Sequence, residues 1–222
     1  STSTTIPITL APPAGTAARI LIAAENATLS LVFAILVLLP LVEIVLRAVA
    51  NIGFQGTTAI VQHLTMAVGM LGAAVAARDE RLIAFSGATL LKGRAAATAR
   101  LLGYAAAAAV SALLCYASLK LVDVERAGGR ILAHGIPVWT VQSLLPLGFG
   151  TIALRLLLRS SARLTGRIFA VLLAAAFIAP FVFFTSESRY LVNAGLAVLA
   201  ATTLLGAPLF ALIGGAALLL LW

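Results

Sequence analysis

The stretch that decides the fold reads IVQHLTMAVGMLGAAVAARDERL and runs from Ile60 to Leu82. It is apolar for most of its length, has Gln62 and His63 side by side near its beginning, and has a run of four charged residues near its end. A helix needs roughly 20 mostly apolar residues to cross the hydrocarbon core of a bilayer. The stretch therefore predicts a transmembrane helix whose end is marked by charge.

The composition of the whole chain agrees with this interpretation. Of its 222 residues, 62% are hydrophobic and 10% are charged, and the mean hydropathy is +1.13. A soluble domain is about half apolar and about a quarter charged. The apolar runs are continuous rather than alternating, which favours helices over membrane-spanning strands. We predict an all-α fold, a polytopic transmembrane helical bundle.

Charge and cysteine content narrow the classes of partner and cofactor. The net charge is +8, and the basic residues lie between apolar runs, which indicates contact with anionic lipid and not with nucleic acid. Cys115 is the single cysteine, so neither a disulfide within the chain nor a cysteine metal cluster is expected. Residues 1–19 are a polar and proline-rich lead-in without the pattern of a signal peptide, and residues 1–24 are predicted to be disordered.

The apolar runs place the membrane spans. Five runs are predicted to be spanning helices: residues 29–49, 57–77, 95–122, 136–158 and 168–184. Two shorter apolar runs follow at 191–205 and 209–222, and a Gly-Ala-Pro turn separates them. Residues 78–94 are expected to connect the second and third spans through a short amphipathic helix on the inner leaflet.

The distribution of Lys and Arg predicts the orientation. Most of the 15 basic residues fall at the N-terminus, between the second and third spans, and between the fourth and fifth spans. Short cytoplasmic loops carry such an excess of basic residues. The N-terminus is therefore predicted to be cytoplasmic, and the connections after the first, third and fifth spans are predicted to face the periplasm of a bacterium.

Four arginines recur every four residues near the end of the fourth span: Arg155, Arg159, Arg163 and Arg167. On one continuous helix they would form a stripe, and contact with lipid headgroups is its expected role. A catalytic or substrate-binding role would need converging acidic residues or a pocket, and the neighbouring sequence has no acidic residue.

Glu43 and Arg47, in the outer part of the first span, stand four residues apart in the order that favours an ion pair within a helix. An ionisable group inside a membrane indicates function by default, because its unpaired burial is unfavourable. The alternative is a neutralised pair that fixes the depth of the helix or holds a partner helix. Gln62 and His63 lie at a similar depth, so an interhelical polar clamp is expected, with contact to another subunit as the second option.

Sequence motifs of hydrolytic and phosphoryl-transfer enzymes are missing. The chain has no HExxH, no Walker loop, no GxSxG and no carboxylate dyad. His63 and His134 are both predicted on the outer side, which leaves a bis-histidine haem open, although neither has a supporting motif. We predict that the chain is not an enzyme and holds no catalytic, cofactor-binding or metal-binding residue.

Three stretches form a recognisable set: LRAVAN with Arg47 and Asn51, VQHLTMAVGMLGAAVAARDERLIAF, and IPVWTVQSLLPLGFG at residues 136–150. Together they resemble the small, four-span membrane subunit of tripartite ATP-independent periplasmic (TRAP) transporters. The first is similar to the end of that subunit's first helix, with its arginine and asparagine. The second is similar to its second helix and connector, and the third to its fourth helix. The resemblance covers residues 25–159. Many members carry acidic residues where this chain has Gln62 and His63.

The end of the chain extends the resemblance. LLGAPLFALIGGAALLLLW, residues 204–222, looks like the start of the family's large transport subunit. Some members join both subunits in one polypeptide through an additional helix. The resemblance therefore implies a four-span small-subunit domain at 25–160, a linker helix at 161–189 and the start of a large transport domain at 190–222.

The resemblance also implies a function. In this family a periplasmic substrate-binding protein delivers an organic anion, such as a carboxylate or an acidic sugar, for sodium-coupled secondary active import. The large subunit holds the substrate and sodium and moves as an elevator, while the small subunit is its stationary scaffold. This chain is then expected to hold no cofactor itself. Its expected partners are the large subunit, the binding protein and anionic lipid of the bacterial inner membrane.

Two other functions stay open at the level of sequence. One is a haem- or quinone-binding membrane anchor of an oxidoreductase. The other is a membrane enzyme that modifies lipids, which the absence of an acid-base set disfavours.

Overall fold

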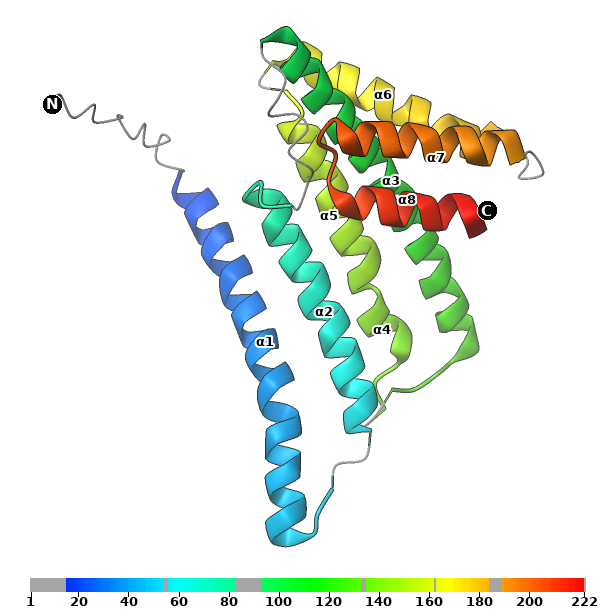
Figure 1. Ribbon diagram of the computed structural model, residues 1–222. Helices are drawn as coiled ribbons and strands as arrows, with labels where there is room; N and C mark the ends of the chain where they lie inside the picture. Colours follow the sequence, from blue (N-terminus) through cyan, green and yellow to red (C-terminus); the bar gives the residue numbers. More distant parts are fainter. Residues whose placement is uncertain are drawn as a thin grey trace, which may run out of the picture.

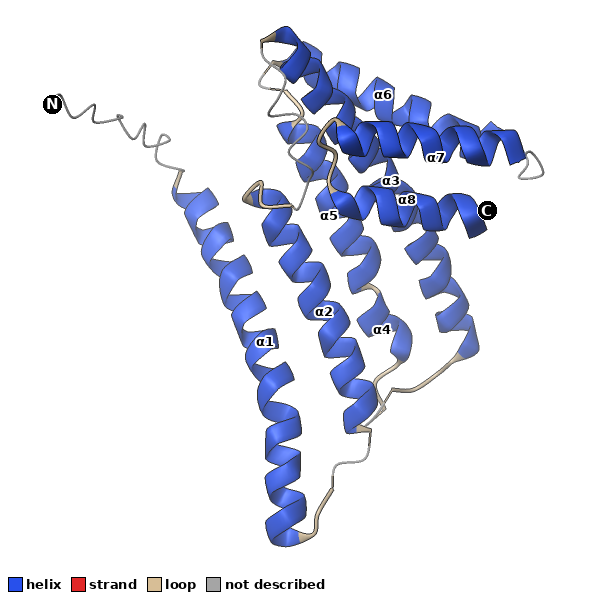
Figure 2. Ribbon diagram, viewed as in Figure 1, coloured by secondary structure: helices blue, strands red, loops and turns tan. Residues whose placement is uncertain are grey.

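The computed structural model describes residues 15–53, 56–82, 93–132, 135–161, 163–183 and 189–221, and helices dominate these ranges (Figure 2). In chain order the helices are α1 Thr16–Ala50, α2 Thr57–Arg78, α3 Arg94–Gly128, α4 Val138–Gln142, α5 Leu144–Arg159, α6 Leu164–Phe183, α7 Arg189–Leu204 and α8 Leu209–Leu221. The all-α prediction is confirmed for the part of the chain that the structure describes.

Four helical stretches are long and apolar enough to cross a membrane: α1, α2, α3, and α4 together with α5. They coincide with the first four predicted spans. The second span agrees most closely, because the charged residues after Ala77 end it sharply. The third is longer than predicted, since α3 continues past residue 122 through a polar stretch to Gly128.

The beginning of α1 differs from the prediction. The helix starts at Thr16 instead of residue 29, so part of the segment predicted to be disordered is helical. Residues 17–24 read AARILIAA, and these residue types favour or tolerate a helix. Residues 1–14 lie outside the described ranges. So do residues 83–92, on which the predicted amphipathic connector falls.

The predicted fifth span forms α6, which is not among the four candidate spans. The helix is 20 residues long, and its apolar stretch is described over Leu164–Ala179. In Figure 1, α6, α7 and α8 lie across one end of the bundle, at a steep angle to α1, α2 and α5. The two shorter runs are helical as predicted, and the turn between α7 and α8 contains Gly206 at a φ of 103°.

The four candidate spans form a layer in the order α1, α2, α5, α3 (Figure 1). The backbone of α1 approaches α2 alone among the described helices, whereas α3 contacts α4, α5, α6, α7 and α8. Hence α1 is at the open edge of the molecule. The end of the bundle that carries Arg78, Arg94 and Arg159 is called the arginine end below.

The core of the molecule lies around the alanine-rich part of α3. Residues 105–109 are all alanine and are at most 2% exposed. Small side chains let neighbouring helices approach closely, which is how helices in membranes gain packing energy. At Gly103 the approach is so close that an added Cβ would lie 3.1 Å from the backbone nitrogen of Ala207.

The fourth span is interrupted at Ser143, which separates α4 from α5. Pro146 lies near the start of α5 and has no N–H group, so it cannot donate to the carbonyl of Gln142 four residues earlier. The interruption therefore follows from the sequence, although the predicted span treated 136–158 as one helix.

Candidate functional site

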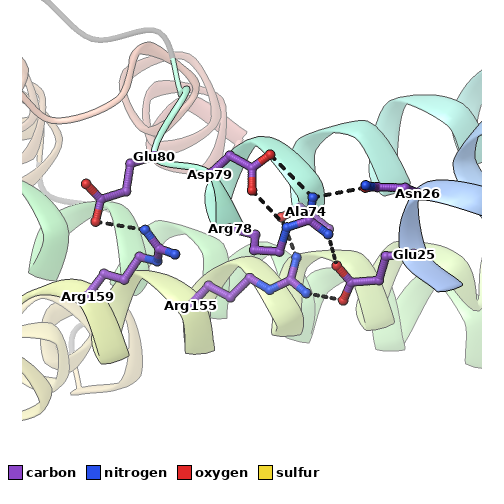
Figure 3. Close-up of polar contacts among 8 residues, drawn as sticks. All are labelled: Glu25, Asn26, Ala74, Arg78, Asp79, Glu80, Arg155 and Arg159. Carbon is purple, nitrogen blue, oxygen red and sulfur yellow. Dashed lines mark hydrogen bonds and ion pairs between the residues drawn. The ribbon is translucent and has the colours of Figure 1, made fainter. Parts of the chain in front are cut away.

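Three helices meet in an ion-pair network at the arginine end (Figure 3). Glu25 of α1 lies between Arg78 of α2 and Arg155 of α5. One carboxylate oxygen accepts a hydrogen bond from Arg78 Nη1 at 2.8 Å, and the other accepts from Arg155 Nη2. One carboxylate thus joins three helices, of which α1 and α5 have no backbone contact.

Further hydrogen bonds fix both guanidinium groups of this network. Arg155 Nη1 donates to the backbone carbonyl of Ala74, one turn before Arg78 on α2. Arg78 Nη2 donates to Asn26 Oδ1 at 2.9 Å, and Arg78 Nε donates to Asp79 Oδ1 at 2.8 Å. The hydrogen bond from Arg78 holds the pKa of Asp79 below its usual value, so this pairing persists at neutral pH and is lost only in acid.

The network is well shielded. The side chains of Arg78 and Arg155 are 14% and 16% exposed, and that of Glu25 is 25% exposed. Shielded charges are unfavourable unless they are paired and hydrogen-bonded, and removal of one partner leaves the others uncompensated. The network, defined as Glu25, Arg78 and Arg155, therefore stabilises one arrangement of the three helices.

A second cluster lies beside the network and consists of Glu80, Arg100 and Arg159. Glu80 pairs with Arg159 of α5 at 2.9 Å and with Arg100 of α3 at 3.4 Å. Its backbone is left-handed, with φ at 56°, and ends α2 with a hydrogen bond from Arg81 N to Ala76 O. A left-handed glutamate is uncommon, and here the conformation directs its carboxylate to α3 and α5.

A cavity of about 230 Å³ lies beside the network, lined mainly by α2 and α5. Its walls are mostly apolar, with Met70 and Leu144 among them. The charged side chains in its described wall, Glu25 and Arg155, are bonded to each other. The chemistry of this end of the molecule is therefore charge neutralisation between helices.

The structure revises the predicted stripe of four arginines. Arg155 and Arg159 lie on α5, Arg163 precedes α6, and Arg167 lies on α6, because the helix ends after Arg159. Arg155 and Arg159 also form ion pairs with Glu25 and Glu80, which are far from them in the sequence. Arg163 is exposed, and Arg167 Nε donates to the carbonyl of Ser161 at 3.0 Å. Lipid contact at these residues stays a prediction.

Glu43 and Arg47 pair with each other within α1, with 2.6 Å between Oε1 and Nη2. The glutamate side chain is 13% exposed and the arginine side chain 67% exposed. The pair lies at the end of the bundle opposite the arginine end and helps to line an open groove of about 480 Å³. Its contact with another subunit stays a prediction.

The expected clamp between α1 and α2 is not seen among the described residues. His63 Nδ1 lies 2.8 Å from the carbonyl of Ala59, one turn earlier on its own helix. Gln62 is exposed and has no hydrogen bond among the described residues. The two pairs are separate because Glu43 already has Arg47 as a partner in its own helix. The polar tie between α1 and α2 lies instead at the arginine end, through Glu25.

Sequence reasoning missed Glu25, Arg78 and the Glu80 cluster as contact residues. A signal was present, because Glu25 is the sole acidic residue before the first predicted span and Arg78 closes the second. Their pairing depends on how far each helix extends, which the apolar runs alone do not give.

The two histidines that leave a haem open are not both described. His134 falls outside the described residues, and His63 is engaged with its own helix. Within the described ranges no three His, Cys, Asp or Glu side chains are grouped so that they could hold a metal ion.

Comparison with known proteins assigns the family. The family model of the DctQ component of tripartite ATP-independent periplasmic transporters matches residues 36–166, which is more than half of the chain. No curated protein and no solved structure matches it. The match includes α2 to α5 and residues 36–50 of α1, and the four candidate spans of the chain agree with the predicted small membrane subunit. The chain therefore belongs to the DctQ family and is a multi-pass membrane component of a TRAP transporter, not an enzyme.

Proposed function

We propose that this chain is the stationary scaffold of a sodium-coupled importer of organic anions, beside a large membrane subunit that moves as an elevator. Membership of the DctQ family supports the part of this proposal that concerns transport. It makes the chain a component of a secondary transporter that depends on a periplasmic binding protein. The family also implies two partners, the large membrane component and that binding protein.

The ion-pair network supports the assignment of a stationary role. A transport domain that slides through lipid needs a neighbour that keeps its shape. Glu25 holds α1, α2 and α5 together with both of its carboxylate oxygens, and Glu80 connects the ends of α2, α3 and α5. Ion pairs that hold helices to one another are better suited to a stationary scaffold than to a transport domain that moves.

Substrate and sodium are proposed to bind in the large subunit, and this chain is proposed to hold no cofactor. Anions such as carboxylates or acidic sugars are the proposed cargo. In secondary transporters these sites usually lie at discontinuous helices near the midplane. The interruption at Ser143 comes three residues before Pro146, whose missing N–H group explains it, so it supports no ligand site.

The proposed location is the bacterial inner membrane, with the N-terminus in the cytoplasm. The excess of arginine at the arginine end supports this orientation, and anionic headgroups are the proposed lipid contacts of the exposed Arg163. No nucleic acid is proposed as a partner. An impermeant thiol reagent tests the orientation: in a Cys115→Ser background, Asn51→Cys should react in spheroplasts and Arg163→Cys only after lysis. The reverse pattern would invert the topology.

Residues 190–222 are proposed to begin the large transport domain, with 161–189 as the linker. The family match ends at residue 166, so α7 and α8 and nearly all of α6 lie beyond it, although they pack against α3. The proposal predicts that the coding sequence continues past residue 222 into further apolar spans. A stop codon at that point would refute it.

Reconstitution tests the scaffold function. The large subunit and the binding protein would be assembled in proteoliposomes with and without this chain, under an inward sodium gradient. The labelled substrate would be a carboxylate that raises the melting temperature of the binding protein. Uptake should need the chain, and it should need the sodium gradient. Equal uptake without the chain would refute a scaffold that transport requires, and haem absorbance in the purified chain would favour the oxidoreductase anchor instead.

A further inference from the structure

The half-buried face of α1 has an unusual regularity. No residue of α1 is buried, and most of its half-buried residues recur at alternating steps of four and three. The seam formed by these residues consists of Glu25, Leu29, Val32, Leu36, Leu39, Glu43 and Leu46. Such spacing is the narrow seam of a coiled coil, and α2 is the helix that it faces.

A seam of this kind leaves the axial position of α1 poorly defined. The five seam residues other than the glutamates are Leu or Val, so a shift by one heptad would bring a similar side chain to most contacts. Lipid chains are as apolar as leucine, so burial gives little preference between such positions. Gly69 and Gly72 on α2 add no steric stop, because an added Cβ at either would meet nothing within 4 Å.

Only the two glutamates break the repetition of the seam. Glu43 pairs with Arg47 of its own helix, and this pair moves along with α1 and cannot define its position. Glu25 pairs with Arg78 and Arg155, which belong to α2 and α5. The positions of these two arginines are also fixed relative to each other, because Arg155 donates a hydrogen bond to the Ala74 carbonyl of α2, the helix that carries Arg78.

We propose that Glu25 is the register residue of α1: it sets the axial position of the helix against α2, and hence its depth in the membrane. A single polar residue in a coiled-coil seam is known to specify register in this way. Arg78 and Arg155 have fixed positions, and the ion pairs of Glu25 with them determine which heptad of α1 lies beside these arginines. Glu25 lies outside the residues matched by the family model, whereas Arg78 and Arg155 lie inside them.

The proposal predicts that the helix follows the carboxylate when it is moved by one heptad. In the double variant Glu25→Leu with Val32→Glu, the new carboxylate lies seven residues later on the same seam. Seven helical residues span about 10 Å, so α1 should slide by about 10 Å toward its N-terminal side. In Figure 1, α1 extends beyond the beginning of α2 at the opposite end, so its last turns would still lie beside α2 after this movement.

Spin-label distances test the prediction in the full chain in nanodiscs. One label replaces Leu41, which is 53% exposed on α1, and the other replaces Gly69 on α2, in a Cys115→Ser background. With Glu25 opposite Arg78 in an antiparallel pair, Leu41 is about 10 Å along the axis from the level of Gly69. The double variant should remove this offset and shorten the measured distance. An unchanged distance would overturn the proposal.

Two further variants keep the test decisive if the double variant does not fold. Glu25→Gln preserves the size of the side chain but weakens the pairing, and it should broaden the distance distribution into more than one position. Glu43→Gln is the matched control on the same seam and should leave the native distance as a single peak. A single native distance in Glu25→Gln, or equal broadening in both variants, would overturn the role of Glu25.

Discussion

α1 and α3 have the same length, 35 residues, and opposite environments. The most apolar window of α1 has a mean hydropathy of 2.8 and is 0% buried, while that of α3 has 1.8 and is 44% buried. The less hydrophobic helix is therefore the central one. In a membrane, lipid accepts apolar side chains as well as protein does, so side-chain size decides which helix is enclosed. The alanines of α3 admit neighbours closely, and the leucines and valines of α1 do not.

The closest approach to α3 gives the largest expected effect. Replacement of Gly103 by leucine would force its side chain against the backbone of Ala207, 3.1 Å from an added Cβ, and backbone cannot move aside as a flexible side chain can. We expect the free energy of unfolding to fall by about 1–3 kcal/mol, measured by denaturant titration in detergent micelles. Gly69→Leu is the matched control, since its added Cβ meets nothing within 4 Å. Equal losses in both variants would show that close packing on α3 is not the cause.

On α1 the largest effect should come from Glu25. Glu25→Ala leaves Arg78 and Arg155 without their shared carboxylate, and both arginine side chains are largely shielded. The expected loss is about 1–2 kcal/mol in the same titration, the upper part of the range for polar contacts between membrane helices. Glu43→Ala should cost less, because its partner Arg47 is 67% exposed and can be hydrated. A larger loss for Glu43→Ala than for Glu25→Ala would mean that α1 is held mainly at the end that carries Glu43.

These two helices also show what sequence could and could not predict. Hydropathy located the first four spans, because length and apolar content are local properties. It did not find the beginning of α1 at Thr16, and so it placed Glu25 outside the helix that carries it. The partners of Glu25 are 53 and 130 residues away in the chain, and their meeting depends on tertiary packing. The clamp predicted between α1 and α2 is not seen among the described residues for a local reason, because Glu43 pairs with Arg47 and His63 bonds to its own helix.

A smaller effect is expected at the left-handed residue that ends α2. Glu80→Gly and Glu80→Ala remove the same ion pairs to Arg100 and Arg159, but only glycine adopts the observed φ of 56° without strain. Glu80→Ala should therefore be less stable than Glu80→Gly by about 1 kcal/mol. If alanine proved equal to glycine in thermal unfolding, the left-handed conformation would not be under strain.

The smallest effect should come from the outward face of α1. Ile35 is 43% exposed and lies off the seam, so Ile35→Ala should change the free energy of unfolding by less than about 0.5 kcal/mol. Leu36→Ala is the companion variant on the seam and should have the larger effect of the two. A loss at Ile35 that exceeds the loss at Leu36 would mean that the outward face is covered by protein in the assembled transporter.

The three-helix contact of Glu25 has a consequence for biogenesis. The ribosome makes Glu25 first, Arg78 53 residues later, and Arg155 130 residues after Glu25. During synthesis the carboxylate therefore meets one arginine when the α1–α2 hairpin is complete, and it gains the second only when the fourth span has been made. The last arginine also bonds the Ala74 carbonyl of α2. Attachment of α1 is thus completed late, and a chain released before residue 155 would leave the nascent hairpin with half of its charge contacts.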